Sequence, residues 1–385
     1  MDHGLTDELR EFQDLTRRFV QKELIPHERA VDAADHIDPA LRRDLCKRAI
    51  EAGLFGFNMP ADVGGPGLPY IAQVVIREQL GQVSMPLQET VGRPPRALLA
   101  CKGEQRDRIL YPVLRAEKTT AFALTEPQAG SDAGQLKTAA IPTEGGFLLR
   151  GTKHFISHGD SADVLVVIAR VPQEGTDGAL TAFLVEKGMK GFSVGRIHPT
   201  MGWRGYQLAE LVFDDCFVPA ANQLGGLGEG LRLAMGNINE SRVGVAAHCV
   251  GMAQRALDLA VGQAKQRMAF NRAIADFQGI QWMLADMAVA IEQSRALVYA
   301  AARTMDSKAG NVRSVVSMAK LSATEMVGSV ADKALQIFGG SGYMAETPIE
   351  MIYRDARAFR IGEGTSEIQR NQIARALLEA GPASA

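Results

Sequence analysis

The sequence predicts a mainly helical α+β protein, with helices at both ends of the chain and a small β-domain between them. Hydrophobic residues recur with the period of helices up to about residue 118 and then fall into short β-branched runs. Beyond residue 225 they return to a helical period. The length of 385 residues exceeds one typical domain. We therefore predict an N-terminal helical domain over 1–118, a central antiparallel β-domain over 119–224 and a C-terminal helical bundle over 225–385.

Helical periodicity is clearest at the N-terminus, where apolar residues recur from Leu5 to Leu24 and predict a helix over about 5–25 that ends at Pro26. The same period predicts further helices at about 39–52, 71–83, 94–116, 229–268, 276–306, 311–337 and 366–380. Small residues such as Gly244 and Gly251 in the helix over 229–268 would let neighbouring helices approach closely.

Short runs rich in apolar and β-branched residues predict strands at 120–124, 146–151, 164–169, 180–185 and 210–213. Because no helix separates these strands, we expect a small antiparallel sheet or barrel. The stretch over 58–70 is rich in Gly and Pro and is typical of a loop.

Composition excludes several classes of partner. The formal net charge of -2 offers no electrostatic basis for binding nucleic acid. The four cysteines lie far apart and form no Cys-x-x-Cys pair, which argues against a zinc site or a disulfide framework and indicates a reduced, intracellular setting. The N-terminus is acidic, and no apolar run approaches the roughly 18 residues of a membrane span. We expect a soluble cytoplasmic protein.

The segment 361–370 is the first candidate site. Glu363 stands between Gly362 and Gly364, so the backbone there can take left-handed angles and another molecule can approach the carboxylate closely. Thr365 or Ser366 can cap the following helix, with Gln369 completing a capping box. This arrangement suits a reactive base. The alternative is a solvated Glu at the start of a helix.

The segment 122–132 runs from a strand into a polar turn that contains Thr125, Glu126, Gly130, Ser131 and Asp132. The backbone amides of such a turn can form a concave site for an anion or a heterocycle, or the segment is a plain β-turn. No Gly-x-Gly-x-x-Gly or Walker sequence is present, so a nucleotide cofactor would bind outside a Rossmann fold.

The segment 151–158 follows at the next strand. Its residues His154 and His158 are four apart, but on a strand this spacing places them roughly 13 Å from each other, which disfavours a metal site. Phe155 would pack against the core or against an aromatic cofactor.

Two further stretches fit phosphate or close backbone contacts. Arg267, with Phe270 and Gln278, lies near a predicted helix end, where a guanidinium can clamp a phosphate or remain solvated. The glycine turn over 336–342 allows close backbone approach or serves as a simple C-cap.

Taken together, these stretches resemble the acyl-CoA dehydrogenase family over essentially the whole chain and in the same order. The turn over 124–132, Leu-Thr-Glu-Pro-Gln-Ala-Gly-Ser-Asp, matches the first signature of the family, and 336–340 with 362–370 matches the later one. The resemblance implies an N-terminal helical domain, a central β-domain and a C-terminal four-helix bundle. It also implies a homotetramer that holds FAD between domains and across a subunit interface, with a role in acyl-CoA catabolism.

The resemblance also assigns binding residues. The flavin ring and ribityl chain would lie against Phe122, Leu124, Thr125, Gly130, Ser131, Phe155, Ile156 and Ser157, with Thr365 and Glu367 near the FAD. The pyrophosphate and adenosine of a neighbouring subunit's FAD would be reached by Arg267, Phe270, Gln278, Gln336, Gly339 and Gly340. The substrate, an acyl-CoA, would be contacted by Ser131, Asn239, Arg242 and Gly364.

Glu363 matches the catalytic base of the family. The resemblance implies that it removes the α-proton of an acyl-CoA thioester while the backbone N–H of the base and a ribityl hydroxyl stabilise the enolate. The β-hydride would pass to flavin N5, giving a trans-2-enoyl-CoA, and an electron-transfer flavoprotein would accept the electrons. The alternatives are an oxidase that uses oxygen, a non-catalytic subunit of a heteromeric dehydrogenase and a flavin-free helical scaffold.

The sequence departs from the family pattern at three positions. Phe155 stands where many members carry Trp, and Asn271 stands where Gly usually follows Phe270. Gly362 replaces the bulky aromatic residue that often precedes the base. We interpret Gly362 as extra room beside the α-carbon for a branched or cyclic acyl group.

Overall fold

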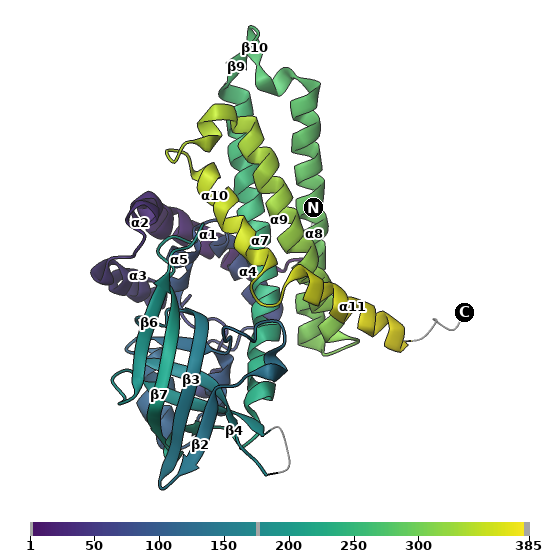
Figure 1. The fold of residues 1–385 in the computed structure, drawn as a ribbon. Coiled ribbons are helices and arrows are strands. Elements are labelled where there is room, and N and C mark those ends of the chain that lie inside the picture. The colour runs from purple at the N-terminus through teal and green to yellow at the C-terminus, as the bar shows by residue number, and fades with distance from the viewer. Residues whose placement is uncertain (1–2, 175–177, 381–385) are drawn as a thin grey trace.

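The computed structural model describes residues 3–174 and 178–380 (Figure 1). One sheet lies at one end of the molecule, and long helices from the C-terminal part of the chain stand beside one another at the other end. The N-terminal helices lie where these two parts meet. The predicted order of helices, strands and helices is confirmed. The domain boundaries at 118 and 224 stay predictions.

The N-terminal part contains α1 (Asp7–Phe19), α2 (Glu28–Ala34), α3 (Pro39–Glu51), α4 (Tyr70–Leu80), α5 (Met85–Gln88) and α6 (Tyr111–Leu114). The predicted stop at Pro26 is only partly right. Pro26 lies in a 3-10 turn, and the helical path continues into α2 until Asp35 adopts a left-handed conformation. A single helix over 94–116 is wrong, because Pro94 and Pro95 precede the first turn and the chain breaks around Gly103, which has a φ of 49°. The stretch forms a 3-10 turn (Arg96–Ala100), a π turn (Arg106–Leu110) and α6.

The central sheet contains β1 (Thr120–Ala123), β2 (Ala139–Thr143), β3 (Gly146–Ser157), β4 (Val164–Val171), β5 (Ala179–Glu186), β6 (Phe192–His198), β7 (Leu208–Pro219) and β8 (Gln223–Leu224). The strand order is β6-β7-β3-β2-β4-β5-β8, with β1 also paired to β4. Most pairs are antiparallel as expected, but β1 and β2 run parallel to β4. The sheet is open and ends at β6 and β8. Of the two predicted forms, a sheet or a barrel, the sheet is therefore the correct one.

Strands β2 and β6 and the two-residue β8 were not predicted. Pro142 interrupts the apolar pattern of β2. The residues of β6 are almost all exposed, so this edge strand carries no apolar run for periodicity to detect. All five predicted strands are present, although β3 and β7 are longer than expected.

The C-terminal part contains the four predicted helices α7 (Gly230–Gln266), α8 (Gln278–Ser307), α9 (Val312–Phe338) and α11 (Ser366–Ala380), and one that was not predicted, α10 (Pro348–Ala356). A short hairpin of β9 (Met268–Ala269) and β10 (Arg272–Ala273) joins α7 to α8. The expected close approach at small residues is confirmed where α7 meets α4. A β-carbon at Gly251 would collide with the carbonyl oxygen of Glu78, and one at Gly81 with that of His248.

A buried ion pair anchors the turn that follows β1. Lys153 on β3 donates from Nζ to Glu126 Oε1 at 2.8 Å and to the carbonyl of Leu124 at 2.9 Å. Glu126 also accepts hydrogen bonds from the backbone N–H groups of Lys137 and Thr138. Burial alone would raise the pKa of the Glu126 carboxyl. Lys153 and these donors lower it by more, so the pKa falls to about 2. The turn is therefore fixed against β3.

We expect Lys153→Met to lower the free energy of unfolding by about 3–5 kcal/mol, because it leaves the Glu126 carboxylate buried without a cation. Denaturant unfolding followed by circular dichroism measures the change. Arg150→Met is the matched control, since Arg150 lies on the same strand and pairs with Asp215 at an exposed site. Its effect should stay below about 1 kcal/mol. An equal loss in both variants would mean that the buried pair does not anchor the turn.

Candidate active site

Glu363 lies in the short loop between a 3-10 turn (Arg357–Arg360) and α11. Its own φ is 57°, in the left-handed region, and Gly364 follows at 89°. Gly362 does not adopt a positive φ, so the strained residue is the carboxylate-bearing one and not the glycine before it. A non-glycine residue in this region costs of order 1–3 kcal/mol and persists only where surrounding contacts hold it.

Side chains from three helices hold this loop by its carbonyl groups. Lys320 on α9 is fully buried and donates from Nζ to the carbonyls of Phe359 and Gly364, both at 2.8 Å. Arg242 on α7 donates from Nε to the Glu363 carbonyl at 2.9 Å, and Gln369 on α11 donates to the Gly364 carbonyl at 2.9 Å. The loop conformation is thus fixed from three directions.

The predicted capping box is wrong. Thr365 caps α11, since its Oγ1 accepts from the backbone N–H of Ile368 at 3.3 Å. Gln369 does not return to the cap, because its amide donates to the carbonyls of Glu363 and Gly364. Ser366 donates from Oγ to Glu325 at 2.6 Å. Glu367 lies exposed in the first turn of α11.

The Glu363 carboxylate contacts α7. Its Oε1 accepts from Ser241 Oγ at 2.8 Å. Asn239 Oδ1 accepts from Arg242 Nη1 at 3.2 Å, and a β-carbon at Gly364 would lie 2.9 Å from Arg242 Nη2. The structure therefore brings three of the predicted substrate-contacting residues, Asn239, Arg242 and Gly364, to the candidate base.

The predicted flavin-contacting residues lie along β1 and β3. The carbonyl of Thr125 accepts from the backbone N–H of His154 at 2.8 Å, so the turn after β1 lies beside β3. Phe155 falls where the β3–β7 register shifts, adopts a φ of 56° and leaves its side chain 53% exposed. Gly130 and Ser131 are exposed on the turn. Ile156 packs into the core. Phe122, Leu124 and Ser157 are half-buried.

A second set of predicted residues lies at the other end of the bundle. Arg267, Phe270 and Gln278 surround the β9–β10 hairpin, which Figure 1 shows far from the central sheet. Gln336, Gly339 and Gly340 lie at the C-terminal end of α9, which returns antiparallel to α8 toward the same end. Gln336 is separated from Lys320 by roughly 24 Å of helix. Within a single chain, the predicted flavin-contacting residues on β1 and β3 therefore lie far from the predicted residues at the hairpin end of the bundle.

Comparison with known proteins identifies the family. Models of the N-terminal, middle and C-terminal domains of acyl-CoA dehydrogenases match residues 6–117, 121–216 and 228–378. The chain belongs to the acyl-CoA dehydrogenase family of oxidoreductases. The fold and the family predicted from the sequence are thereby confirmed.

The similarity extends over the full length of several relatives. The chain is 40% identical to an acryloyl-CoA reductase (NADH) of Anaerotignum propionicum, over 98% of this chain and 96% of that one. It is 36% identical to the caffeyl-CoA reductase-Etf complex subunit CarC of Acetobacterium woodii, over 95% and 97%. The solved structure of butyryl-CoA dehydrogenase from Megasphaera elsdenii superposes with a TM-score of 0.89 at 34% identity, over 97% and 99%.

Acyl-CoA dehydrogenases bind FAD, and the residues present fit such a group. The exposed ring of Phe155 offers a flat apolar surface beside the half-buried Thr125. A β-carbon at Gly130 would meet no atom within 4 Å, so the turn leaves open space for a ligand. The same is true of Gly339 and Gly340 at the far end of the bundle.

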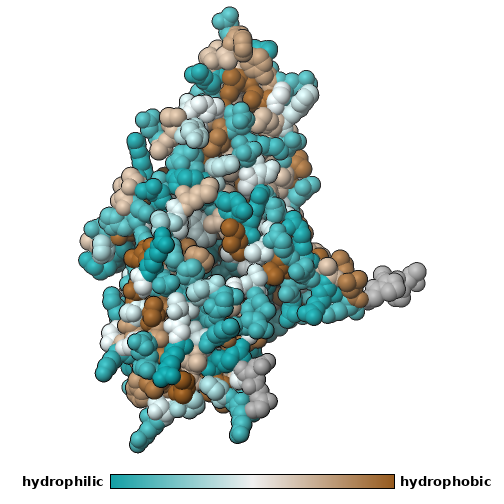
Figure 2. Space-filling model, viewed as in Figure 1, coloured by the Kyte–Doolittle hydropathy of each residue, from teal (hydrophilic) through white to brown (hydrophobic). Residues whose placement is uncertain are grey.

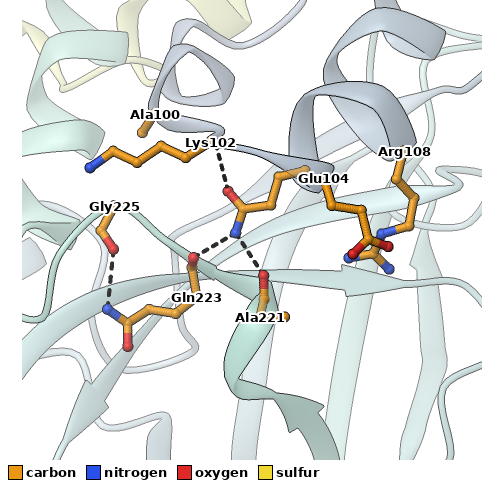
Figure 3. Close-up of a pocket in the computed structure, with 8 residues that line it drawn as sticks. Ala100, Lys102, Glu104, Arg108, Ala221, Gln223 and Gly225 are labelled. Carbon is orange, nitrogen blue, oxygen red and sulfur yellow. Dashed lines mark hydrogen bonds between the residues drawn. The ribbon is translucent and has the colours of Figure 1, made fainter.

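Other kinds of site find no support in the described ranges. Residues 3–174 and 178–380 contain no group of three or more His, Cys, Asp or Glu that could hold a metal, and all four cysteines are free. Within the same ranges no helix is both long and apolar enough to cross a membrane. A cavity of about 220 Å³ beside Lys102, Gln223 and Gly225 contains none of the predicted site residues (Figure 3). The cytoplasmic location stays a prediction.

Sequence reasoning missed three residues of the site. Ser241 lies inside the predicted 239–242 stretch but was not itself singled out. Lys320 has a detectable signal, because a lysine at this position shares the helical spacing of the buried Val316 and Val327. Arg93, which donates to Ser241, stands in an irregular segment and gives no periodic signal.

We expect Lys320→Met to loosen the loop that carries Glu363, because two buried carbonyls lose their donor at about 1–3 kcal/mol each. Hydrogen–deuterium exchange should show faster exchange of the amides over 361–370. Lys333→Met is the matched control, since Lys333 lies on the same helix and only pairs with Asp286 at 3.6 Å. Equal exchange in the two variants would rule out this role for Lys320.

Proposed function

We propose that this protein catalyses the FAD-dependent α,β-dehydrogenation of an acyl-CoA thioester to a trans-2-enoyl-CoA, with Glu363 as the base. The observation that carries the proposal is the strained backbone of Glu363, held by Lys320, Arg242 and Gln369. A strained carboxylate-bearing residue with this much support fits a functional group better than a solvated surface charge. FAD, when bound, supplies the acceptor for the hydride that leaves the β-carbon.

The loop contacts suggest how Glu363 works. Its carbonyl oxygen is engaged by Arg242, while none of the hydrogen bonds among the described residues uses its backbone N–H. That N–H is left to donate to the thioester carbonyl, on which negative charge develops as the α-proton leaves. Ser241 fixes Oε1 of the carboxylate, which leaves Oε2 to accept the proton.

The remaining binding roles are proposed as the resemblance implies them. The acyl-CoA would contact Ser131, Asn239, Arg242 and Gly364, and the FAD would lie against the β1 turn and β3 around Phe155. Within a single chain, the hairpin residues lie far from this site. We therefore propose that Arg267 and its neighbours reach the FAD of another subunit in a homotetramer. Figure 2 shows hydrophobic surface at the end of the molecule that carries the hairpin. Large exposed side chains in the hairpin and in the segments that flank it support such an interface: Met268, Phe270, Trp282 and Tyr343.

We further propose that an electron-transfer flavoprotein accepts the electrons, which the Etf complex of the Acetobacterium woodii relative supports. The Anaerotignum propionicum relative is named for the reverse direction, reduction. Glu363 serves either direction, because the group that removes the α-proton also returns it in the reverse reaction. We propose dehydrogenation as the direction in this protein.

Glu363→Gln should slow the bleaching of the flavin by acyl-CoA thioesters under anaerobic conditions by about 10²–10⁴-fold, the usual contribution of a general base to the rate. Visible absorbance of the purified holoprotein, titrated with short, long, branched and aromatic thioesters, measures it. Glu379→Gln controls for charge, since Glu379 lies exposed on α11 and pairs only with Arg375.

Other results of that titration would each contradict part of the proposal. Peroxide formed when air is then admitted, with no other acceptor present, identifies an oxidase. A colourless protein that does not take up FAD identifies a non-catalytic subunit or a scaffold. A flavin that stays oxidised with every thioester leaves the family assignment standing and removes the proposed reaction.

Gly362→Tyr should shift the substrate preference from branched or cyclic acyl groups toward straight chains, by roughly tenfold or more in the ratio of kcat/KM values. The substitution is sterically tolerable, because a β-carbon at Gly362 meets only the Ala358 carbonyl at 3.7 Å. Gly362→Ala should give a smaller shift in the same direction. An unchanged preference in Gly362→Tyr would mean that Gly362 does not shape the acyl pocket.

A further inference from the structure

We propose that the acyl group of the substrate carries a carboxylate a few bonds from the thioester, and that Arg93 binds it. This inference rests on the proposed function and names the substrate class. Arg93 lies in the irregular segment after the 3-10 turn Glu89–Val91, where Gly92 has a φ of 73° and two prolines follow. The segment is stiff, so the guanidinium is presented from a fixed backbone.

The guanidinium is one hydroxyl group away from the candidate base. Arg93 Nη2 donates to Ser241 Oγ at 3.4 Å, and Ser241 Oγ in turn donates to Glu363 Oε1 at 2.8 Å. Because Glu363 must reach the α-proton, a group bound by Arg93 lies close to the α-carbon. The acyl chain is therefore short, or carries its recognised group near the thioester.

Arg93 has far fewer partners than its chemistry allows. A guanidinium offers five N–H donors, and the bond to Ser241 is long. Its Nε is buried without a hydrogen-bond partner. Across residues 3–174 and 178–380, no carboxylate forms an ion pair with Arg93. A carboxylate is the ligand whose two oxygens match a guanidinium bidentately.

The neighbouring arginines are paired, which makes Arg93 the exception. Arg77 lies 3.8 Å from Glu89, and Arg96 lies 3.5 Å from Glu240. Burial lowers the pKa of Arg93, but Glu240, Glu89 and Glu363 together raise it, so the guanidinium remains charged. Glu89 and Glu240 are thus shared among three guanidinium groups, and Glu363, across Ser241, is the third carboxylate of the cluster.

Proton transfer removes that balance. When Glu363 accepts the α-proton it becomes neutral, and the three guanidinium groups of Arg77, Arg93 and Arg96 then face only the two carboxylates of Glu89 and Glu240. An uncompensated buried cation is costly, and a substrate carboxylate on Arg93 offsets it. An aliphatic chain in the same place would instead cover the guanidinium without supplying an acceptor.

Binding to holoprotein in which Glu363→Gln mimics the protonated base tests the inference without turnover. Titration calorimetry compares glutaryl-CoA with pentanoyl-CoA, which have the same number of acyl carbons and differ in the carboxylate. We expect glutaryl-CoA to bind about tenfold to a hundredfold more tightly, as a charged hydrogen-bond pair predicts. Adding Arg93→Gln should remove the difference, and Arg93→Lys, which keeps the charge without the fork, should retain part of it.

The outcomes separate this inference from the proposed function. Equal affinity for both thioesters, or an equal loss for both in Arg93→Gln, overturns the carboxylate site while the proposed function stands. If neither thioester binds, the proposed function is removed, and the carboxylate site with it. Circular dichroism and FAD content show whether each variant is folded, and the Arg93→Lys result decides the question if Arg93→Gln is not.

Discussion

The site depends on one constraint, which is that Glu363 must be held in a left-handed backbone conformation. The conformation is unfavourable for a residue with a β-carbon, so donors from α7, α9 and α11 hold the loop through its carbonyl groups. The strongest of these is the buried Lys320, whose pKa is lowered to about 8, mainly by burial. Burying an amine is costly, and the two carbonyls it binds provide the compensation. Three helices of the bundle thus hold the loop that carries Glu363.

The electrostatics of the site follow from how closely α4 packs on α7. Glycines at positions 81 and 251 remove the side chains that would separate these helices. This close packing places Arg77 of α4 beside Gly244 of α7, where a β-carbon would lie 3.2 Å from its Nε. The ion pair of Arg77 with Glu89 therefore forms at a tightly packed interface, where both side chains are largely buried, charges interact strongly and unpaired groups are costly. Small residues in α7 therefore determine how closely α4 and α7 pack. Through that packing they also determine how closely Arg77 approaches the charged groups near Glu363.

Elements with strong periodicity could be predicted from the sequence, and contacts between distant segments could not. The long helices and the central strands carry their own signal, whereas β6 is exposed and the stretch over 94–116 is broken around Gly103. Glu363 and Arg242 were found because motifs mark them. The predicted capping box is absent because the Gln369 amide donates to the carbonyls of Glu363 and Gly364. Ser241 and Arg93 gain their roles only through tertiary contacts, which the sequence pattern does not show.

The hairpin at the far end of the bundle also carries positive φ values, here in the two-residue turn that joins β9 to β10. Phe270 and Asn271 both adopt positive φ values, and the Phe270 side chain is 89% exposed. Its ring meets the Phe277 ring edge-on, with 6.0 Å between the ring centroids, and Arg272 covers the Phe277 ring at 3.9 Å. At Glu363 the cost of a left-handed residue is offset by three donors of the same chain. In the hairpin the β9–β10 pairing supports the turn, whereas the exposed Phe270 side chain gains little burial within this chain. The proposed second subunit would cover that side chain.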